Sequence, residues 1–119
     1  YLVHDLNIGG SHQILRSPKP VPVGTTSLGF YMSRDEQSQR GLGQLVIDDD
    51  VVSTQETANI FSLMISWSGL DIGLDRGTAV SNYEAPNQFT GDLIKVTIDL
   101  ADDQLLDGDG LGRAEMMRE

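Results

Sequence analysis

Short segments in which apolar and polar residues alternate, each closed by a turn signal, recur along this chain and constrain its fold more than any other feature. Successive side chains of a β-strand point to opposite faces, so this alternation gives each strand one apolar face. No segment before residue 101 has the apolar period of a helix. Short strands of this kind must pair sheet on sheet. The sequence therefore predicts an all-β fold, an antiparallel β-sandwich or jelly roll with a short C-terminal helix.

The predicted strands and connections follow from this pattern. Strands are expected at 1–8, 25–33, 44–47, 60–67, around Ile72 and Leu74, and at 92–100, which shows the clearest alternation. Connections are expected at Gly9-Gly10, in the proline-rich stretch 17–24, in a polar hairpin loop at 34–43, at Asp48-Asp49-Asp50 and in a long loop at 76–89. Two apolar rows stand out: Leu28, Phe30 and Met32 in one strand, and Ile94, Val96, Ile98 and Leu100 in another.

The chain has 119 residues, which fits one domain that buries roughly two-thirds of its unfolded surface. We expect a β-sandwich domain at 1–100 and a tail at 101–119. The tail contains good helix formers at 113–119 and should hold one short helix. The chain opens at Tyr1 inside an apolar pattern without an initiating methionine. We therefore expect a piece of a longer protein, or a processed one.

The charge balance excludes several classes of partner. Eight basic residues against eighteen acidic ones give a net charge of −10, which repels phosphate backbones and anionic lipid. Nucleic acid is therefore not an expected partner. No stretch approaches the ~18 apolar residues of a membrane span, so a membrane is not expected either. The chain has no cysteine, which excludes disulfides and thiolate sites and leaves the cellular compartment open.

Acidic and histidine residues suggest several sites, and each has a plainer structural interpretation. The aspartates at 48–50 and at 107 and 109 have the density of calcium ligands but not the ligand spacing, so turn roles are favoured. His4 and His12 flank the first turn without a further ligand nearby, which favours strand-edge roles. We therefore expect no metal site in this chain.

The segment around Gly73 holds a further candidate site. Asp71 and Asp75 would point to the same side of a strand, as a pair of acid–base carboxylates requires. No third catalytic group is implied, and Arg76 is better interpreted as pairing with a nearby carboxylate and fixing the loop. Trp67 and Tyr83, with Tyr31, would suit a sugar-stacking platform, whereas the alternation around Trp67 favours a core position. No Gly-x-Ser-x-Gly nucleophile elbow is present.

One stretch is more specific than a pattern. The run Asp-Ile-Gly-Leu-Asp-Arg-Gly-Thr-Ala-Val-Ser at 71–81 is followed by Tyr83, Pro86, Phe-Thr-Gly at 89–91 and Val-Thr-Ile-Asp-Leu at 96–100. It resembles the C-terminal region of large bacterial-type arylsulfatases. Looser matches extend the resemblance over nearly the whole chain, at 5–7, 16–17, 22–24, 28–30, 43–45 and 113–116. The chain departs from the family pattern at 34–41 and 48–50.

The resemblance implies a parent enzyme and a non-catalytic fragment. In that family the chemistry lies in a separate, preceding α/β domain, where a Cys or Ser becomes formylglycine beside calcium. This chain has no cysteine, and Ser17-Pro18-Lys19 does not fit the Cys/Ser-x-Pro-x-Arg motif, so no catalytic residue or cofactor carries over. The first hypothesis is an accessory C-terminal domain that packs on the catalytic sulfatase domain. Its candidate partner or ligand residues are Asp71, Asp75, Arg76, Tyr83 and Trp67.

Two other functions remain open on the residues. One is a lectin-like carbohydrate-binding module, against which the acidic surface argues where sulfated sugars are concerned. The other is an independent hydrolase, which would need a nucleophile and base that the chain does not offer.

Overall fold

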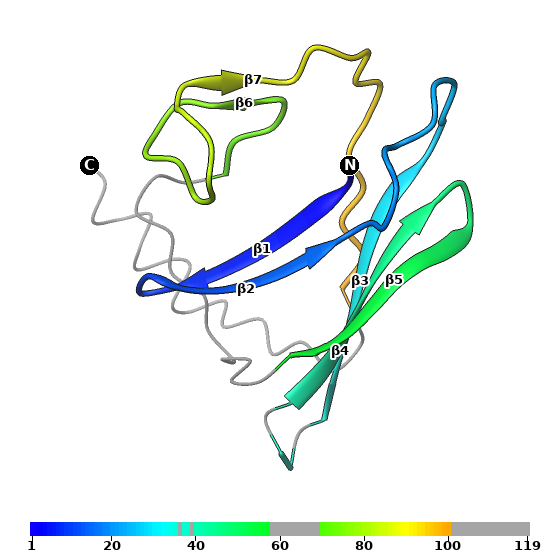
Figure 1. Ribbon diagram of the computed structural model, residues 1–119, viewed down its shortest axis with the longest axis vertical. Coiled ribbons are helices and arrows are strands. Elements are labelled where there is room, and N and C mark those ends of the chain that lie inside the picture. The colour runs from blue at the N-terminus through cyan, green and yellow to red at the C-terminus, as the bar shows by residue number, and fades with distance from the viewer. Residues whose placement is uncertain (36, 39, 58–69, 101–119) are drawn as a thin grey trace. The chain divides into compact units, whose positions relative to one another are not determined.

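A computed structural model describes residues 1–35, 37–38, 40–57 and 70–100 of the chain (Figure 1). These residues form strands and no helix, and every ladder is antiparallel, so the prediction of an all-β fold is confirmed. The strands are β1 (Val3–Ile8), β2 (Ser11–Arg16), β3 (Leu28–Asp35), β4 (Arg40–Ile47), β5 (Asp50–Thr57), β6 (Leu74–Asp75) and β7 (Asn87–Gln88).

The chain divides into two units, Tyr1–Phe89 and Thr90–Glu119. The predicted strand at 60–67, including Trp67, and the predicted helix at 113–119 lie outside the described residues. Within the described ranges, no helix is long and apolar enough to cross a membrane.

Strands β1 and β2 form a hairpin around the predicted Gly9-Gly10 turn. Ile8 pairs with Ser11, and the two glycines between them have φ of 59° and 91°. Two-residue hairpin loops favour positive φ at both positions because that backbone twist matches the twist of the strands, and glycine adopts it without strain. The Asn7 side chain accepts a hydrogen bond from the Gly10 amide at 2.9 Å. Both the strand and its turn are thus encoded locally.

Strands β3, β4 and β5 form a three-stranded sheet in that order. The predicted hairpin loop at 34–43 is wrong at both ends, because β3 continues to Asp35 and β4 begins at Arg40. Ladder hydrogen bonds join backbone groups, so polar side chains do not end a strand when they stand on a solvated face. The turn is closed instead by the Asp35 carboxylate, which accepts the amides of Gln37 at 2.9 Å and Ser38 at 3.3 Å.

The β4–β5 turn consists of Asp48 and Asp49, with φ of 46° and 73°. Asp48 Oδ1 accepts hydrogen bonds from the Thr26 amide at 2.8 Å and the Ser27 amide at 2.9 Å. These two bonds, from Thr26 first and Ser27 second, hold the pKa of Asp48 below its usual value. The turn role predicted for this aspartate run is confirmed.

Replacing Asp48 should destabilise the sheet. We expect Asp48→Ala to lower the melting temperature by several degrees, because it removes the oxygen that accepts both amides and because alanine tolerates positive φ less well than aspartate. The matched control is Asp49→Gly, which relieves positive φ and should leave the melting temperature unchanged or raise it. Circular dichroism melts of both variants test this, and equal losses would contradict it.

The buried core lies between the β1–β2 hairpin and the β3–β4–β5 sheet, where β2 contacts β4 and β5 (Figure 1). The buried apolar side chains among the described residues are Leu6, Leu15, Leu45 and Ile47, and Leu45 is only 1% exposed. A Cβ at Gly43 would lie 3.2 Å from the ring of Phe30, a tight contact, and 3.6 Å from Leu15. The two strand layers therefore meet closely over Gly43, as a sandwich requires.

His4 also joins the two layers, since its ring stacks on Phe30 with centroids 3.5 Å apart and an interplanar angle of 6°. Burial lowers the pKa of His4 below 6.5, against the opposing charge of Asp5. The unfolded chain then binds a proton more readily than the folded one, so the free energy of unfolding should fall as pH drops from 6.5 through the folded pKa. NMR titration should find His4 below 6.5, and a value at or above 6.5 would contradict this.

The segment predicted as the clearest strand, 92–100, is not a strand. It forms no ladder with another described segment, and its apolar row is exposed, with Ile94 at 95%, Val96 at 50% and Ile98 at 65%. Alternation predicts an extended backbone with one apolar face, whereas a strand also needs a ladder partner, which this segment lacks among the described residues.

The loop expected at 76–89 is shorter than predicted, because β7 lies inside it and pairs with β6. Leu74 is opposite Gln88 and Asp75 is opposite Asn87, so the short strand expected around Ile72 and Leu74 is present at Leu74–Asp75. The ladder closes the base of the loop.

Candidate functional site

Hydrogen bonds to two aspartates hold the shape of the loop that the β6–β7 ladder closes. The first aspartate is Asp71. Its Oδ1 accepts hydrogen bonds from Arg76 Nε at 2.9 Å and Nη2 at 2.5 Å, and its Oδ2 accepts the Arg76 amide at 3.0 Å. The Arg76 side-chain bonds come first in holding the pKa of Asp71 below its usual value. The same bonds raise the pKa of Arg76. Arg76 thus fixes the loop through a nearby carboxylate, as its sequence position indicated.

The second aspartate, Asp75, holds the far side of the loop. Tyr83 donates its hydroxyl proton to Asp75 Oδ2 at 2.5 Å, and the Gly77 amide donates to Oδ1 at 3.0 Å. The bond to Asp75 is the main cause of the raised pKa of Tyr83. The Tyr83 oxygen also accepts the Val80 amide at 3.4 Å. The Tyr83 hydroxyl therefore links the Asp75 carboxylate to the Val80 amide within the loop.

The two aspartates do not form the shared pair that an acid–base site needs. Asp71 is taken up by Arg76, and Asp75 is taken up by Tyr83 and the Gly77 amide. A carboxylate pair of this type works because one group holds the proton that the other lacks. Here each carboxylate has its own donors, so the arrangement gives shape to the loop. Of the predicted site residues, the structure brings together Asp71, Asp75, Arg76 and Tyr83, while Trp67 lies outside the described residues.

A second polar group, which sequence reasoning missed, fastens the loop to the β1–β2 hairpin. Asp5 is only 4% exposed at its side chain, and its oxygens lie 2.8 and 3.0 Å from His12 Nδ1. Ser81 from the loop forms a further side-chain hydrogen bond to Asp5. The Asn7 amide donates to the Val80 carbonyl at 3.4 Å. The contacts of Ser81 with Asp5 and of Asn7 with Val80 join residues more than 70 positions apart.

The electrostatics of Asp5 follow from this environment. Burial raises the pKa of its carboxyl, but hydrogen bonds from Ser81 and then His12 outweigh burial and hold the pKa below 3.8. The carboxylate is therefore charged in the folded protein at neutral pH.

The signal for the Asp5–His12 contact was present in the hairpin register. A two-residue turn at Gly9-Gly10 places Asn7 opposite His12 and Asp5 opposite Ile14. Asp5 and His12 are then diagonal neighbours on one face of the ladder, within reach of a long side chain. The contact to Ser81 had no comparable local signal.

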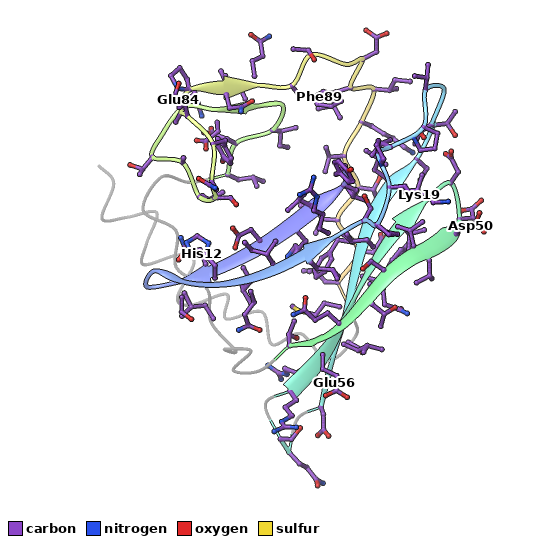
Figure 2. All side chains as sticks on the ribbon, viewed as in Figure 1. His12, Lys19, Asp50, Glu56, Glu84 and Phe89 are labelled. Atoms are coloured by element: carbon purple, nitrogen blue, oxygen red, sulfur yellow. The ribbon has the colours of Figure 1, made fainter. Side chains whose placement is uncertain are left out.

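A shallow hollow lies where the hairpin meets the loop, and His12 projects into this region from β2 (Figure 2). It is lined by Asn7, His12, Ile14, Ala79, Ser81 and Asn82. Because the Asp5 carboxylate accepts at Nδ1, that nitrogen of His12 carries a proton. Ser81 bonds to Asp5 and not to the imidazole, so the order of a Ser–His–Asp nucleophile is not met. The hollow offers neutral hydrogen-bonding groups over small apolar side chains.

No group of three or more His, Cys, Asp or Glu residues in the described part of the chain could hold a metal ion. The aspartates at 107 and 109 lie outside that part.

Comparison of the chain with protein-family models, with curated proteins and with solved structures finds no match. The geometry of the loop, its attachment to the hairpin and the exposed side chains described below are therefore the basis for a functional conclusion.

Proposed function

We propose that this chain is a non-catalytic C-terminal accessory domain of an arylsulfatase-like sulfuric ester hydrolase. It packs on a catalytic domain that is absent from this chain, and the loop at 70–89 is the contact surface. The observation that carries the proposal is the apolar exterior of this loop. Its exposed side chains are Leu70 at 72%, Ile72 at 54%, Leu74 at 38%, Val80 at 53% and Phe89 at 52%.

The different placement of polar and apolar side chains in the loop supports docking. Asp71, Asp75, Arg76 and Tyr83 are paired with one another within the loop, as the Asp71–Arg76 and Asp75–Tyr83 bonds illustrate. Its large apolar side chains are left facing solvent. Exposed apolar side chains gathered on one ordered segment are typical of protein contact surfaces, and a preorganised loop loses little entropy on binding. Interfaces have apolar centres depleted in charge, and the exposed apolar side chains of this loop would supply such a centre.

The first test is to sequence the coding DNA upstream of Tyr1. The proposal expects an in-frame α/β domain with a Cys/Ser-x-Pro-x-Arg motif. A frame without that motif would overturn it.

The second test measures docking directly. The upstream domain, expressed separately, is titrated with this chain by calorimetry, using wild type, Ile72→Asp and the control Val23→Asp. Val23 is fully exposed in the proline-rich stretch, outside the loop. We expect Ile72→Asp to weaken binding by tenfold or more, which corresponds to about 1.4 kcal/mol, and Val23→Asp to leave it unchanged. Equal effects of both variants, or no binding by the wild type, would contradict docking through the loop.

A lectin-like, carbohydrate-binding function is the second candidate, and the hollow favours it. Asn82, Ser81 and His12 supply hydrogen-bonding groups beside Ile14 and Ala79, a composition that suits a neutral hydroxylated ligand. A thermal-shift titration with neutral and sulfated oligosaccharides tests it. A ligand at a hundredfold excess over Kd should stabilise the fold by roughly 2.7 kcal/mol. Loss of a saturable shift in Asn82→Ala would favour the carbohydrate function over the accessory one, and no shift with any sugar would remove it.

A further inference from the structure

The outer face of the β3–β4–β5 sheet, opposite the core, carries an aromatic ring that lies over a glycine. Tyr31 and Gly29 are two residues apart on β3, so they share this face. A Cβ at Gly29 would lie 3.2 Å from Cε2 and 3.8 Å from Cζ of Tyr31, so the ring runs along the strand over the glycine. Tyr31 is nevertheless 62% exposed. The ring therefore rests on the sheet and presents much of its surface to solvent.

Two neutral polar side chains continue from Tyr31 across the sheet. Gln44 is the partner of Tyr31 on β4, and Thr54 is the partner of Gln44 on β5. Neighbouring strands lie about 4.8 Å apart, so the three side chains form one row on the outer face. The Tyr31 hydroxyl, the Gln44 amide and the Thr54 hydroxyl make no hydrogen bond to another described residue. The row thus combines an aromatic surface with donors and acceptors that a ligand can use.

The charge of this face indicates the kind of ligand. The chain has a net charge of −10, yet neither this row nor the adjacent row of Gly29, Val46 and Val51 contains a charged side chain. The next charged side chain along this face of β5 is Glu56, at the opposite end of the strand from Asp50 (Figure 2). A charged ligand group placed on the row would lose hydration without meeting an opposite charge. The row therefore favours an uncharged ligand.

We propose that the outer face of this sheet binds a neutral oligosaccharide, with the Tyr31 ring as its stacking surface. A pyranose carries C–H groups on the faces of its ring and hydroxyls around its edge. It can therefore place an apolar face on the tyrosine while its edge reaches Gln44 and Thr54 on the next strands. Tyrosine offers this contact area with few rotatable bonds, so little side-chain entropy is lost on binding.

A sugar suits this face better than a protein partner does. Protein interfaces are built around a broad apolar centre, whereas this row has one ring followed by two polar side chains. The row lies on β3, β4 and β5, away from both the loop at 70–89 and the hollow beside His12. The proposal therefore goes beyond the function proposed above and does not depend on it.

Calorimetry of the full chain with neutral hexasaccharides of glucose, xylose, mannose and galactose tests the proposal. We expect at least one to bind the wild type, and Tyr31→Leu to weaken that binding about tenfold or more, because leucine covers Gly29 without offering a ring. Tyr31→Phe should keep most of the affinity. The matched control is Tyr1→Leu, since Tyr1 is 57% exposed and lies outside the sheet, and it should bind like the wild type. Circular dichroism melts verify the fold of each variant.

Four outcomes would overturn the assignment. The first is that none of the four sugars binds. The second is that Asn82→Ala weakens sugar binding while Tyr31→Leu does not, which would place the sugar in the hollow. The third is a wild-type dimer, seen by light scattering, that Tyr31→Leu abolishes in the absence of sugar binding, which would assign the face to a second copy. The fourth is that photochemically induced nuclear polarisation, which detects accessible tyrosines, finds Tyr31 covered in the chain without sugar.

Discussion

Leu45→Ala is expected to lower the free energy of unfolding by about 2 to 5 kcal/mol, the largest effect of any single truncation among the described residues. Leu45 is 1% exposed and lies on β4, between β3 and β5 and beneath the hairpin. Truncation removes apolar contacts and leaves a cavity that the close contact over Gly43 cannot readily fill. Domains of this size are stable by only about 5 to 15 kcal/mol, so the variant should unfold at a much lower urea concentration.

Leu42→Ala is the matched control for Leu45. Leu42 is on the same strand but is 36% exposed, on the opposite side of the sheet. Leu42→Ala should lower the free energy of unfolding by less than about 1 kcal/mol. Urea titrations of both variants would establish the difference, provided that the unfolding free energy depends on urea concentration with the same slope as in the wild type. Similar losses at the two positions would show that the core is not where the structure has it.

Asp5→Ala is expected to have the second largest effect, about 1.5 to 3 kcal/mol, because a buried carboxylate loses its charge-assisted bonds to His12 and Ser81. The loss should appear chiefly as detachment of the loop, seen as faster amide exchange around Val80 and Ser81 while β3, β4 and β5 stay protected. The matched control is Asp50→Ala, since Asp50 is an exposed aspartate at the start of β5.

The pH dependence of the Asp5 effect has a definite sign. The folded pKa of Asp5 lies below 3.8, so its contribution is fully present above that value and is lost as pH falls through the folded pKa. The difference between wild type and Asp5→Ala should therefore shrink as pH falls below about 4. A difference that persists undiminished at pH 2 would contradict a charged Asp5.

What the sequence predicted well was encoded over short distances. The Gly9-Gly10 turn and the Arg76–Asp71 pair each depend on residues within a few positions of one another, and propensity and spacing suffice to find them. The all-β fold follows from the same local patterns.

What the sequence missed depends on distant partners. The alternation at 92–100 predicts a strand, but the structure has none there, because a strand also needs a ladder partner and no local pattern supplies one. The contact of Asp5 with Ser81 likewise joins two surface-like residues whose proximity is set by how the loop meets the hairpin. Hydrogen bonds between distant polar side chains leave no periodic pattern in the sequence, whereas a buried apolar row does.

The hydrogen bonds within the loop at 70–89 join residues close in sequence, whereas those that attach the loop to the hairpin join distant residues. The Asp71–Arg76 and Asp75–Tyr83 bonds and the β6–β7 ladder all close within the loop, whereas the Asn7–Val80 bond closes across 73 positions. Loop-closure entropy makes the short-range bonds form first and the long-range ones last. The loop should therefore open and close on the hairpin as one body, keeping its internal shape, so that its apolar exterior is preformed before a partner arrives.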